Sequence, residues 1–219
     1  INLFGMLGST YHLMGDEAKA FKTWDDALNQ MGNNSQVFRT MANFAIERRA
    51  FSKAIEILKR GKQLAEDKNS LAYEIANLYS LTMQFKEAAE EYCKILLSAP
   101  DQLAGVESRI LQFANKPDAL KTVTSVVEEY QDSHISFEYL SARLYIEAKD
   151  FDRAFELYSS LDKKINGGGS ELLSFALFLY NEKEYAVAEN IYDLILERYP
   201  ASPLISQAKL GLAKTKEAV

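Results

Sequence analysis

The sequence predicts an all-α fold in which about six helix-turn-helix repeats follow one another and a last helix caps the array. Three observations support this fold class. Alanine recurs about every 34 residues, the apolar side chains around each Ala follow the helical period, and the 219 residues include only 4 Pro and 10 Gly. A chain of this length has room for one large or two small domains. The periodicity instead indicates repeated units without one central core.

The second helix of each repeat is marked by its alanine. Six alanines follow one another at steps of 34, 34, 31, 35 and 34 residues: Ala20, Ala54, Ala88, Ala119, Ala154 and Ala188. Four positions after each Ala stands a bulky residue, such as Trp24, Tyr92 or Tyr192. Residues four apart lie on one helical face, so each pair is expected to face the core together.

The first helix of each repeat is marked by a small residue twelve positions before that alanine. Five repeats have one: Gly8, Ala42, Ala76, Ala142 and Ala176. A short turn then separates the two helices, as at 14–16 or 148–150. Asp, Asn and Ser in these turns are favoured N-cap residues. Two helices of about 13 residues and two turns account for the period.

These positions resemble the consensus of the tetratricopeptide repeat (TPR) family. The first repeat carries seven matching residues: Phe4, Leu7, Gly8, Tyr11, Ala20, Trp24 and Ala27. Pro100 and Pro200 close the third and sixth repeats. Departures also occur, since Glu17 replaces an aromatic residue, and the fourth repeat is short and degenerate, with Pro117 expected to open its second helix.

The predicted domain is a single TPR solenoid over 1–219. Its repeats are expected at about 1–34, 35–68, 69–99, 100–134 (degenerate), 135–168 and 169–202, and 203–219 is a capping helix or the start of a further repeat. The segment Asn166-Gly-Gly-Gly-Ser170 is a flexible loop between repeats. It is not a phosphate-binding loop, because no Lys-Ser or Lys-Thr follows it.

The TPR resemblance implies a right-handed α-α superhelix whose first helices line a concave groove. Eight groove candidates follow from the family pattern: His12, Arg39, Asn43, Tyr73, Asn77, Tyr139, Arg143 and Tyr180. Asn43 and Asn77 occupy equivalent positions in successive repeats, and amides in such a row can hold the main chain of an extended peptide. The alternative is that these residues are ordinary exposed positions of helices.

One specific family function is disfavoured. Chaperone-binding TPR domains hold a terminal carboxylate with Lys, Asn and Arg side chains, and Arg39 and Asn43 match two of those places. Glu74 and Asp101 stand where the pattern requires Asn and Lys. Their negative charges would repel a carboxylate ligand.

Composition excludes several other classes. A formal net charge of −6 and a pI near 5.1 do not indicate the basic surface that nucleic-acid binding usually needs. No apolar run approaches the roughly 20 residues of a membrane span, so no membrane insertion is expected. The lone Cys93 excludes internal disulfides and is expected to be a small buried residue. His12 and His134 lack partners at ligand spacing, so neither a metal nor another cofactor is predicted.

The charged runs are interpreted as surface. Adjacent carboxylates such as Asp25-Asp26 and Glu90-Glu91 are typical of solvated helix faces, because neighbouring helical residues point apart. The basic stretch 48–62 is interleaved with Glu47 and Glu56 and predicts a salt-bridged outer surface.

The predicted function is that of a non-enzymatic scaffold, which binds a peptide or a helix of a partner protein in its groove. The chain offers no clustered catalytic constellation. The alternative is a repeat segment of a larger enzyme or of a bacterial envelope or secretion assembly. A homodimer through the end repeats is also possible, because end repeats expose apolar faces. A cytoplasmic and a bacterial periplasmic or envelope location both stay open.

Overall fold

The computed structural model describes residues 1–32, 34–64, 69 and 71–218, and the regular elements among them are all helical. The chain divides into two compact units, Ile1–Val126 and Val127–Val219. The first contains α1 (Asn2–Leu13), α2 (Glu17–Met31), α3 (Ser35–Glu47), α4 (Phe51–Leu64), α5 (Ala72–Leu81), α6 (Phe85–Ser98), the 3-10 turn η1 (Pro100–Gln102) and α7 (Leu103–Ala114). Helix α8 (Ala119–Glu128) crosses the boundary. The second contains α9 (Ile135–Glu147), α10 (Phe151–Lys164), α11 (Ser170–Asn181), α12 (Tyr185–Arg198) and α13 (Ile205–Ala218).

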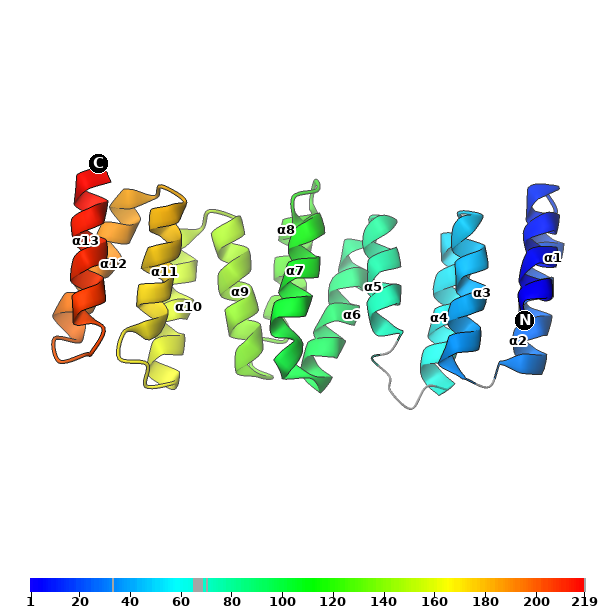
Figure 1. The fold of residues 1–219 in the computed structure, drawn as a ribbon, viewed down its shortest axis with the longest axis horizontal. Helices are drawn as coiled ribbons and strands as arrows, with labels where there is room; N and C mark the ends of the chain where they lie inside the picture. Colours follow the sequence, from blue (N-terminus) through cyan, green and yellow to red (C-terminus); the bar gives the residue numbers. More distant parts are fainter. Residues whose placement is uncertain (33, 65–68, 70, 219) are drawn as a thin grey trace. The chain divides into compact units, whose positions relative to one another are not determined.

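The all-α fold class is confirmed. In the first unit α1 packs with α2, α3 with α4 and α5 with α6, and in the second unit α9 packs with α10 and α11 with α12 (Figure 1). Each helical hairpin falls inside one expected repeat. The expected junction between the second and third repeats includes residues 65–68 and 70, which lie outside the described residues. The single solenoid over 1–219 and its hand stay predictions.

The turn inside each hairpin repeats the same backbone geometry. Five residues at equivalent positions adopt the left-handed conformation, with φ between 57° and 81°: Gly15, Arg49, Met83, Lys149 and Lys183. The N–H group of the following residue donates to the carbonyl oxygen five positions earlier, as from Asp16 to Tyr11 and from Gln84 to Tyr79, both at 2.9 Å. This is the Schellman arrangement that ends a helix. It reverses the chain at the same point of these five repeats.

The small residues allow the helices of a hairpin to approach closely. A Cβ atom added to Gly8 of α1 would lie 2.2 Å from Nε1 of Trp24. Trp24 of α2 is fully buried, and its indole N–H donates a 3.2 Å hydrogen bond to the carbonyl oxygen of Gly5. Gly5 in turn lies against Phe44 of α3. The six period-defining alanines are all fully buried, as their spacing predicts.

The last helix covers the final hairpin, as expected of a cap. Helix α13 packs on α12, and Gly211 of α13 lies against the ring of the buried Tyr192, where an added Cβ would come within 2.4 Å. Ala208 on the same helix is fully buried. The two helices therefore meet through small residues opposite a large ring, as α1 and α2 do.

The fourth repeat is short, with helices of 12 and 10 residues. The prediction that Pro117 opens the second helix is wrong by two residues, because α8 begins at Ala119. Pro117 lies in the preceding turn, and Asp118 next to it has a φ of 60°. A left-handed residue between Pro117 and the helix explains the later start.

The glycine-rich connection between α10 and α11 is anchored, which the expectation of a flexible loop missed. Asp162 of α10 is 1% exposed, and its carboxylate accepts hydrogen bonds from the backbone N–H groups of Gly169, at 2.9 Å, and Glu171, at 3.1 Å. Gly169 has a φ of 99°, which an L side chain rarely adopts. The loop thus places backbone N–H donors around the buried carboxylate of Asp162 at the start of α11.

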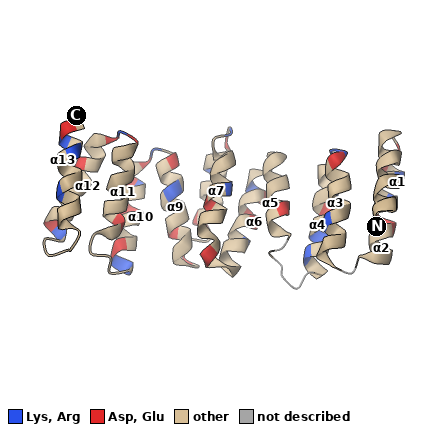
Figure 2. Cartoon of the chain, viewed as in Figure 1, with Lys and Arg blue, Asp and Glu red and all other residues tan. Residues whose placement is uncertain are grey.

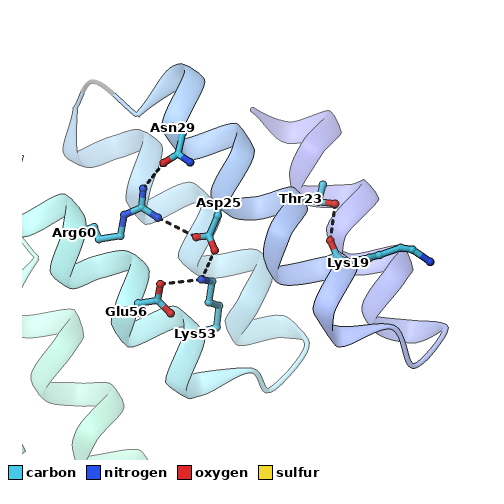
Figure 3. A network of polar contacts seen from close by, with 7 residues as sticks. All are labelled: Lys19, Thr23, Asp25, Asn29, Lys53, Glu56 and Arg60. Atoms are coloured by element: carbon cyan, nitrogen blue, oxygen red, sulfur yellow. Dashed lines mark hydrogen bonds and ion pairs between the residues drawn. The ribbon is translucent and has the colours of Figure 1, made fainter.

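The basic stretch 48–62 forms ion pairs with helices of the neighbouring repeats as well as ion pairs within its own helix. Figure 3 shows Asp25 of α2 between Lys53 and Arg60 of α4, at 2.6 and 2.9 Å. Lys53 is only 6% exposed, so this part of the expected outer surface is buried. Glu91 of α6, expected on a solvated face, is buried as well and pairs with Lys62 of α4 at 2.6 Å. These contacts tie α2 to α4 and α4 to α6.

Candidate functional site

The most developed candidate surface lies on α5, η1 and α7 of the first unit. The guanidinium carbon of Arg109 lies 4.6 Å above the ring centre of Tyr73, and the Tyr73 hydroxyl donates to Oε1 of Gln102 at 3.3 Å. An added Cβ at the exposed Gly105 would lie 3.7 Å from the same hydroxyl, an ordinary van der Waals distance, so Gly105 borders the Tyr73 hydroxyl. We call Tyr73, Asn77, Gln102 and Arg109 the α5–α7 platform.

Asn77 is held on this platform by a buried tyrosine. The hydroxyl of Tyr92, from α6, donates a 2.6 Å hydrogen bond to Oδ1 of Asn77. Burial raises the pKa of Tyr92 to about 12 and also raises the pKa of Tyr73, so both hydroxyls stay protonated donors at neutral pH. With its oxygen engaged, the exposed amide of Asn77 has its NH2 group left to offer a ligand.

Arg39 and Asn43 lie on α3, one repeat earlier. Nε of Arg39 is 2.7 Å from Oε1 of Glu74 on α5, and one terminal nitrogen donates to Gln36. Asn43 is exposed and makes no hydrogen bond among the described residues. The two amides that the sequence aligns, Asn43 and Asn77, therefore differ, because only Asn77 has a tyrosine to fix its orientation.

His12 lies against the second helix of its own repeat. Its ring stacks on Trp24 with the ring centres 6.3 Å apart, and Nε2 is 3.9 Å from a carboxylate oxygen of Glu17. His12 lines a surface pocket at the turn between α3 and α4, together with Phe21 and Phe51 among others. It is half-buried and does not reach the α5–α7 platform through any described contact.

The second unit has its own set of predicted residues. Arg143 of α9 places its guanidinium 4.8 Å from the ring centre of Phe178 on α11, and both line a pocket with Glu147. Tyr139 hydrogen-bonds to Glu171. Burial, and to a smaller extent the negative charge of Glu171, raises the pKa of Tyr139. Tyr180 packs against Tyr185 with ring centres 5.6 Å apart.

Two platform residues escaped the sequence reasoning. Gln102 and Arg109 belong to the degenerate fourth repeat, where the irregular spacing prevents an assignment by family position. The signal that could have found them is helical spacing, since 102, 105 and 109 follow one another at steps of three and four residues. That spacing could not have shown that they contact Tyr73, because this contact depends on how the fourth repeat packs on the third.

Other kinds of site are not evident in the described residues. Within them no group of three or more His, Cys, Asp or Glu could hold a metal ion. No described helix is both long and apolar enough to cross a membrane. His134 is the N-cap of α9 and accepts a hydrogen bond from the backbone of Ser136, and Cys93 is fully buried. Figure 2 shows both signs of charge spread over the helices of each unit.

Comparisons with known proteins add little. No protein-family model matches the chain, and a search of curated proteins finds no match. The chain is similar to one in "Structure of Naa15/Naa10 bound to HypK-THB", at 15% identity and a TM-score of 0.42 over 97% of this chain, but it spans only 33% of that one. It is also similar to a tetratricopeptide repeat protein from Parabacteroides merdae, at 12% identity and a TM-score of 0.40, over 99% of this chain and 92% of that one.

The fold follows from the chain's own packing, and these distant likenesses carry nothing about function. Helical hairpins recur at the 34-residue spacing, each ends its first helix with the same left-handed turn, and each buries its alanine against a neighbouring helix. The described chain therefore has a TPR-like repeat fold.

Proposed function

We propose that the chain is a non-enzymatic scaffold that binds an extended peptide or a helix of a partner protein on its first-helix surfaces. The observation that carries the proposal is the α5–α7 platform. It combines an aromatic ring, a guanidinium stacked on that ring and a fixed amide, all from first helices or the turn before one. Each group suits recognition of a peptide better than chemistry on a substrate.

The chemistry of the platform matches the main chain of a peptide. Tyr92 holds Oδ1 of Asn77, so the N–H groups of Asn77 are left for carbonyl oxygens of a ligand. Arg109 forms no ion pair among the described residues, and stacking on Tyr73 limits the freedom of its side chain. A donor that is already oriented loses less entropy on binding. The ring of Tyr73 adds an apolar face beside these donors.

The experiment starts by selecting peptides on the immobilised 219-residue chain from a random display library. Affinity for a selected peptide is then measured by calorimetry for the wild type and for Tyr73→Ala with Asn77→Ala. We expect the double variant to lose at least tenfold in affinity, about 1.4 kcal/mol. The matched control is Glu87→Ala, at an exposed position of α6, which should bind as the wild type does. Equal affinity in all three proteins, with helical content intact, contradicts the proposal.

Two further expectations from the sequence stay proposals. The first is that the partner is a protein and not a nucleic acid. The second is the alternative function, in which the chain is a repeat segment of a larger enzyme or of a bacterial envelope or secretion assembly, and it rests on sequence alone. Homodimerisation through an end repeat is a third proposal, and it too rests on sequence alone.

A further inference from the structure

Asn166 and Gly167 form the only Asn-Gly pair in the 219-residue sequence. Such a pair is chemically labile in an unfolded chain, because the backbone nitrogen of the second residue attacks the side-chain amide carbon of the Asn. A glycine hinders this attack least, since it has no side chain. A new N–C bond closes a five-membered imide, and ammonia leaves. Water then opens the imide to an aspartate or an isoaspartate, so the reaction is a deamidation that consumes only water.

The folded loop leaves the Asn166 side chain open to water but engages the nitrogen that would attack it. Asn166 is exposed and adopts the left-handed conformation, with a φ of 53°. The N–H group of Gly167 donates to the backbone carbonyl oxygen of Asp162 at 2.8 Å, which is the Schellman contact at the end of α10. The carbonyl oxygen of Gly167 accepts from the N–H group of Ser170 at 3.1 Å. Attack needs this N–H group released and its peptide free to rotate, so the folded loop opposes the reaction.

The buried carboxylate of Asp162 holds the loop in this conformation. Its two oxygens accept from the N–H group of Gly169 at 3.0 and 2.9 Å, and Oδ1 also accepts from that of Glu171 at 3.1 Å. The hydroxyl of Tyr199 hydrogen-bonds to the same carboxylate, which raises the pKa of Tyr199. We call Asp162 with these donors the Asp162 lock. A buried charge that loses its partners is costly, so the loop opens only when these contacts break together.

We propose that Asn166 is a latent deamidation site, which the Asp162 lock protects in the folded protein and which reacts when the loop between α10 and α11 opens. Local openings of this kind need less free energy than global unfolding. In the isoaspartate product the main chain passes through the former side chain and gains one carbon. This change displaces the N–H group of Gly167 from its acceptor and weakens the junction between the two hairpins. The inference does not depend on peptide binding by the α5–α7 platform.

Mass spectrometry of the intact 219-residue chain and of its peptides follows the reaction during incubation in mildly alkaline buffer, with and without urea. Deamidation at Asn166 should be slower in native buffer than in urea by about tenfold or more, because only chains with an open loop react. Asn166→Gln should remove the change in urea, which assigns it to this position. Equal rates with and without urea would overturn the protection.

Asp162→Asn tests the lock itself. It keeps the size of the side chain but removes the charge and one acceptor oxygen, so the rate at Asn166 in native buffer should rise by roughly threefold or more. The rate in urea should not change, because the lock is absent there. The matched control is Asp152→Asn, at an exposed position of the same helix, which should leave both rates at Asn166 as in the wild type. Gly8→Ala, which strains the packing of α1 on α2 in the other unit, should also leave them unchanged.

Equal acceleration by Gly8→Ala would mean that Asn166 reacts in globally unfolded chains, and it would overturn the local lock. A native rate that Asp162→Asn leaves unchanged would overturn it too. Circular dichroism checks that each variant keeps its helices. If Asp162→Asn does not, Tyr199→Phe replaces it, since this change removes one hydrogen bond to the carboxylate and should raise the native rate in the same direction. Each of these outcomes leaves the scaffold proposal where it stands.

Discussion

The hydroxyl of Tyr92 donates a 2.6 Å hydrogen bond to the amide oxygen of Asn77. This bond joins the core of one hairpin to its candidate binding surface, because Tyr92 is fully buried on α6 and Asn77 is exposed on α5. The sequence marks Tyr92 as a packing residue and Asn77 as a surface residue. Their contact means that the packing residue also sets the orientation of the surface one.

Removing that hydroxyl should affect both stability and binding. We expect Tyr92→Phe to lower the free energy of unfolding by about 0.5–1.5 kcal/mol, the usual net value of one hydrogen bond. Peptide affinity should fall a few-fold, because the Asn77 amide becomes free to rotate. Urea unfolding and calorimetry measure the two effects. Tyr79→Phe, which removes a hydroxyl without a described hydrogen bond, is the control and should change neither.

The close approach of α1 and α2 makes Gly8 sensitive to size. Gly8→Ala forces a Cβ against the rigid, fully buried Trp24 ring and should cost about 1–3 kcal/mol. Gly105→Ala on α7 meets nothing closer than 3.7 Å and should be neutral or stabilising, since Ala has the higher helix propensity. Chemical denaturation compares them. Equal effects would contradict the packing of α1 on α2.

The recurring left-handed turn predicts sites of stabilisation. Met83 and Lys149 adopt φ values of 60° and 57°, where an L side chain costs roughly 1–2 kcal/mol, whereas Gly15 fills the equivalent place at 81°. Met83→Gly should therefore stabilise the chain by about 0.5–1 kcal/mol despite the added freedom of the unfolded state. Gly15→Ala should do the reverse. Thermal melts resolve the two signs, and destabilisation by Met83→Gly would count against the strain.

Glu91 predicts a pH dependence. Burial acts to raise its pKa, but hydrogen bonds from Lys62 and Lys94, at 2.6 and 2.9 Å, outweigh burial and hold it below the ordinary 4.5. A lowered folded pKa stabilises the protein above the unfolded pKa, and this contribution is lost as the pH falls through the folded pKa. Glu91→Gln should cost about 1–2 kcal/mol at pH 7.

The difference between Glu91→Gln and wild type should shrink as the pH falls below 4.5. Urea titrations at several pH values measure it. Glu87→Gln, on the exposed face of the same helix, is the matched variant and should track the wild type at every pH. A gap that stays constant at acidic pH would rule out the ionised pair as its source.

Residue spacing alone predicts the helical hairpins well. The alanine period places α2, α4, α6, α10 and α12, and it predicts the burial of Trp24 and Tyr192, because helical geometry converts spacing into a face. Where the spacing breaks, the prediction weakens. Pro117 lies outside the helix that it was expected to open, and the platform residues Gln102 and Arg109 went unassigned.

The sequence by itself determined the repeat, its helices and its buried faces, since these depend on contacts within about one period. The tertiary structure decided which side chains meet across periods. It brought Arg109 over Tyr73, tied Glu91 to Lys62 and turned Asp162 toward the backbone of Gly169. Such polar contacts depend on the relative placement of helices and on side-chain rotamers, and neither follows a period that a sequence displays.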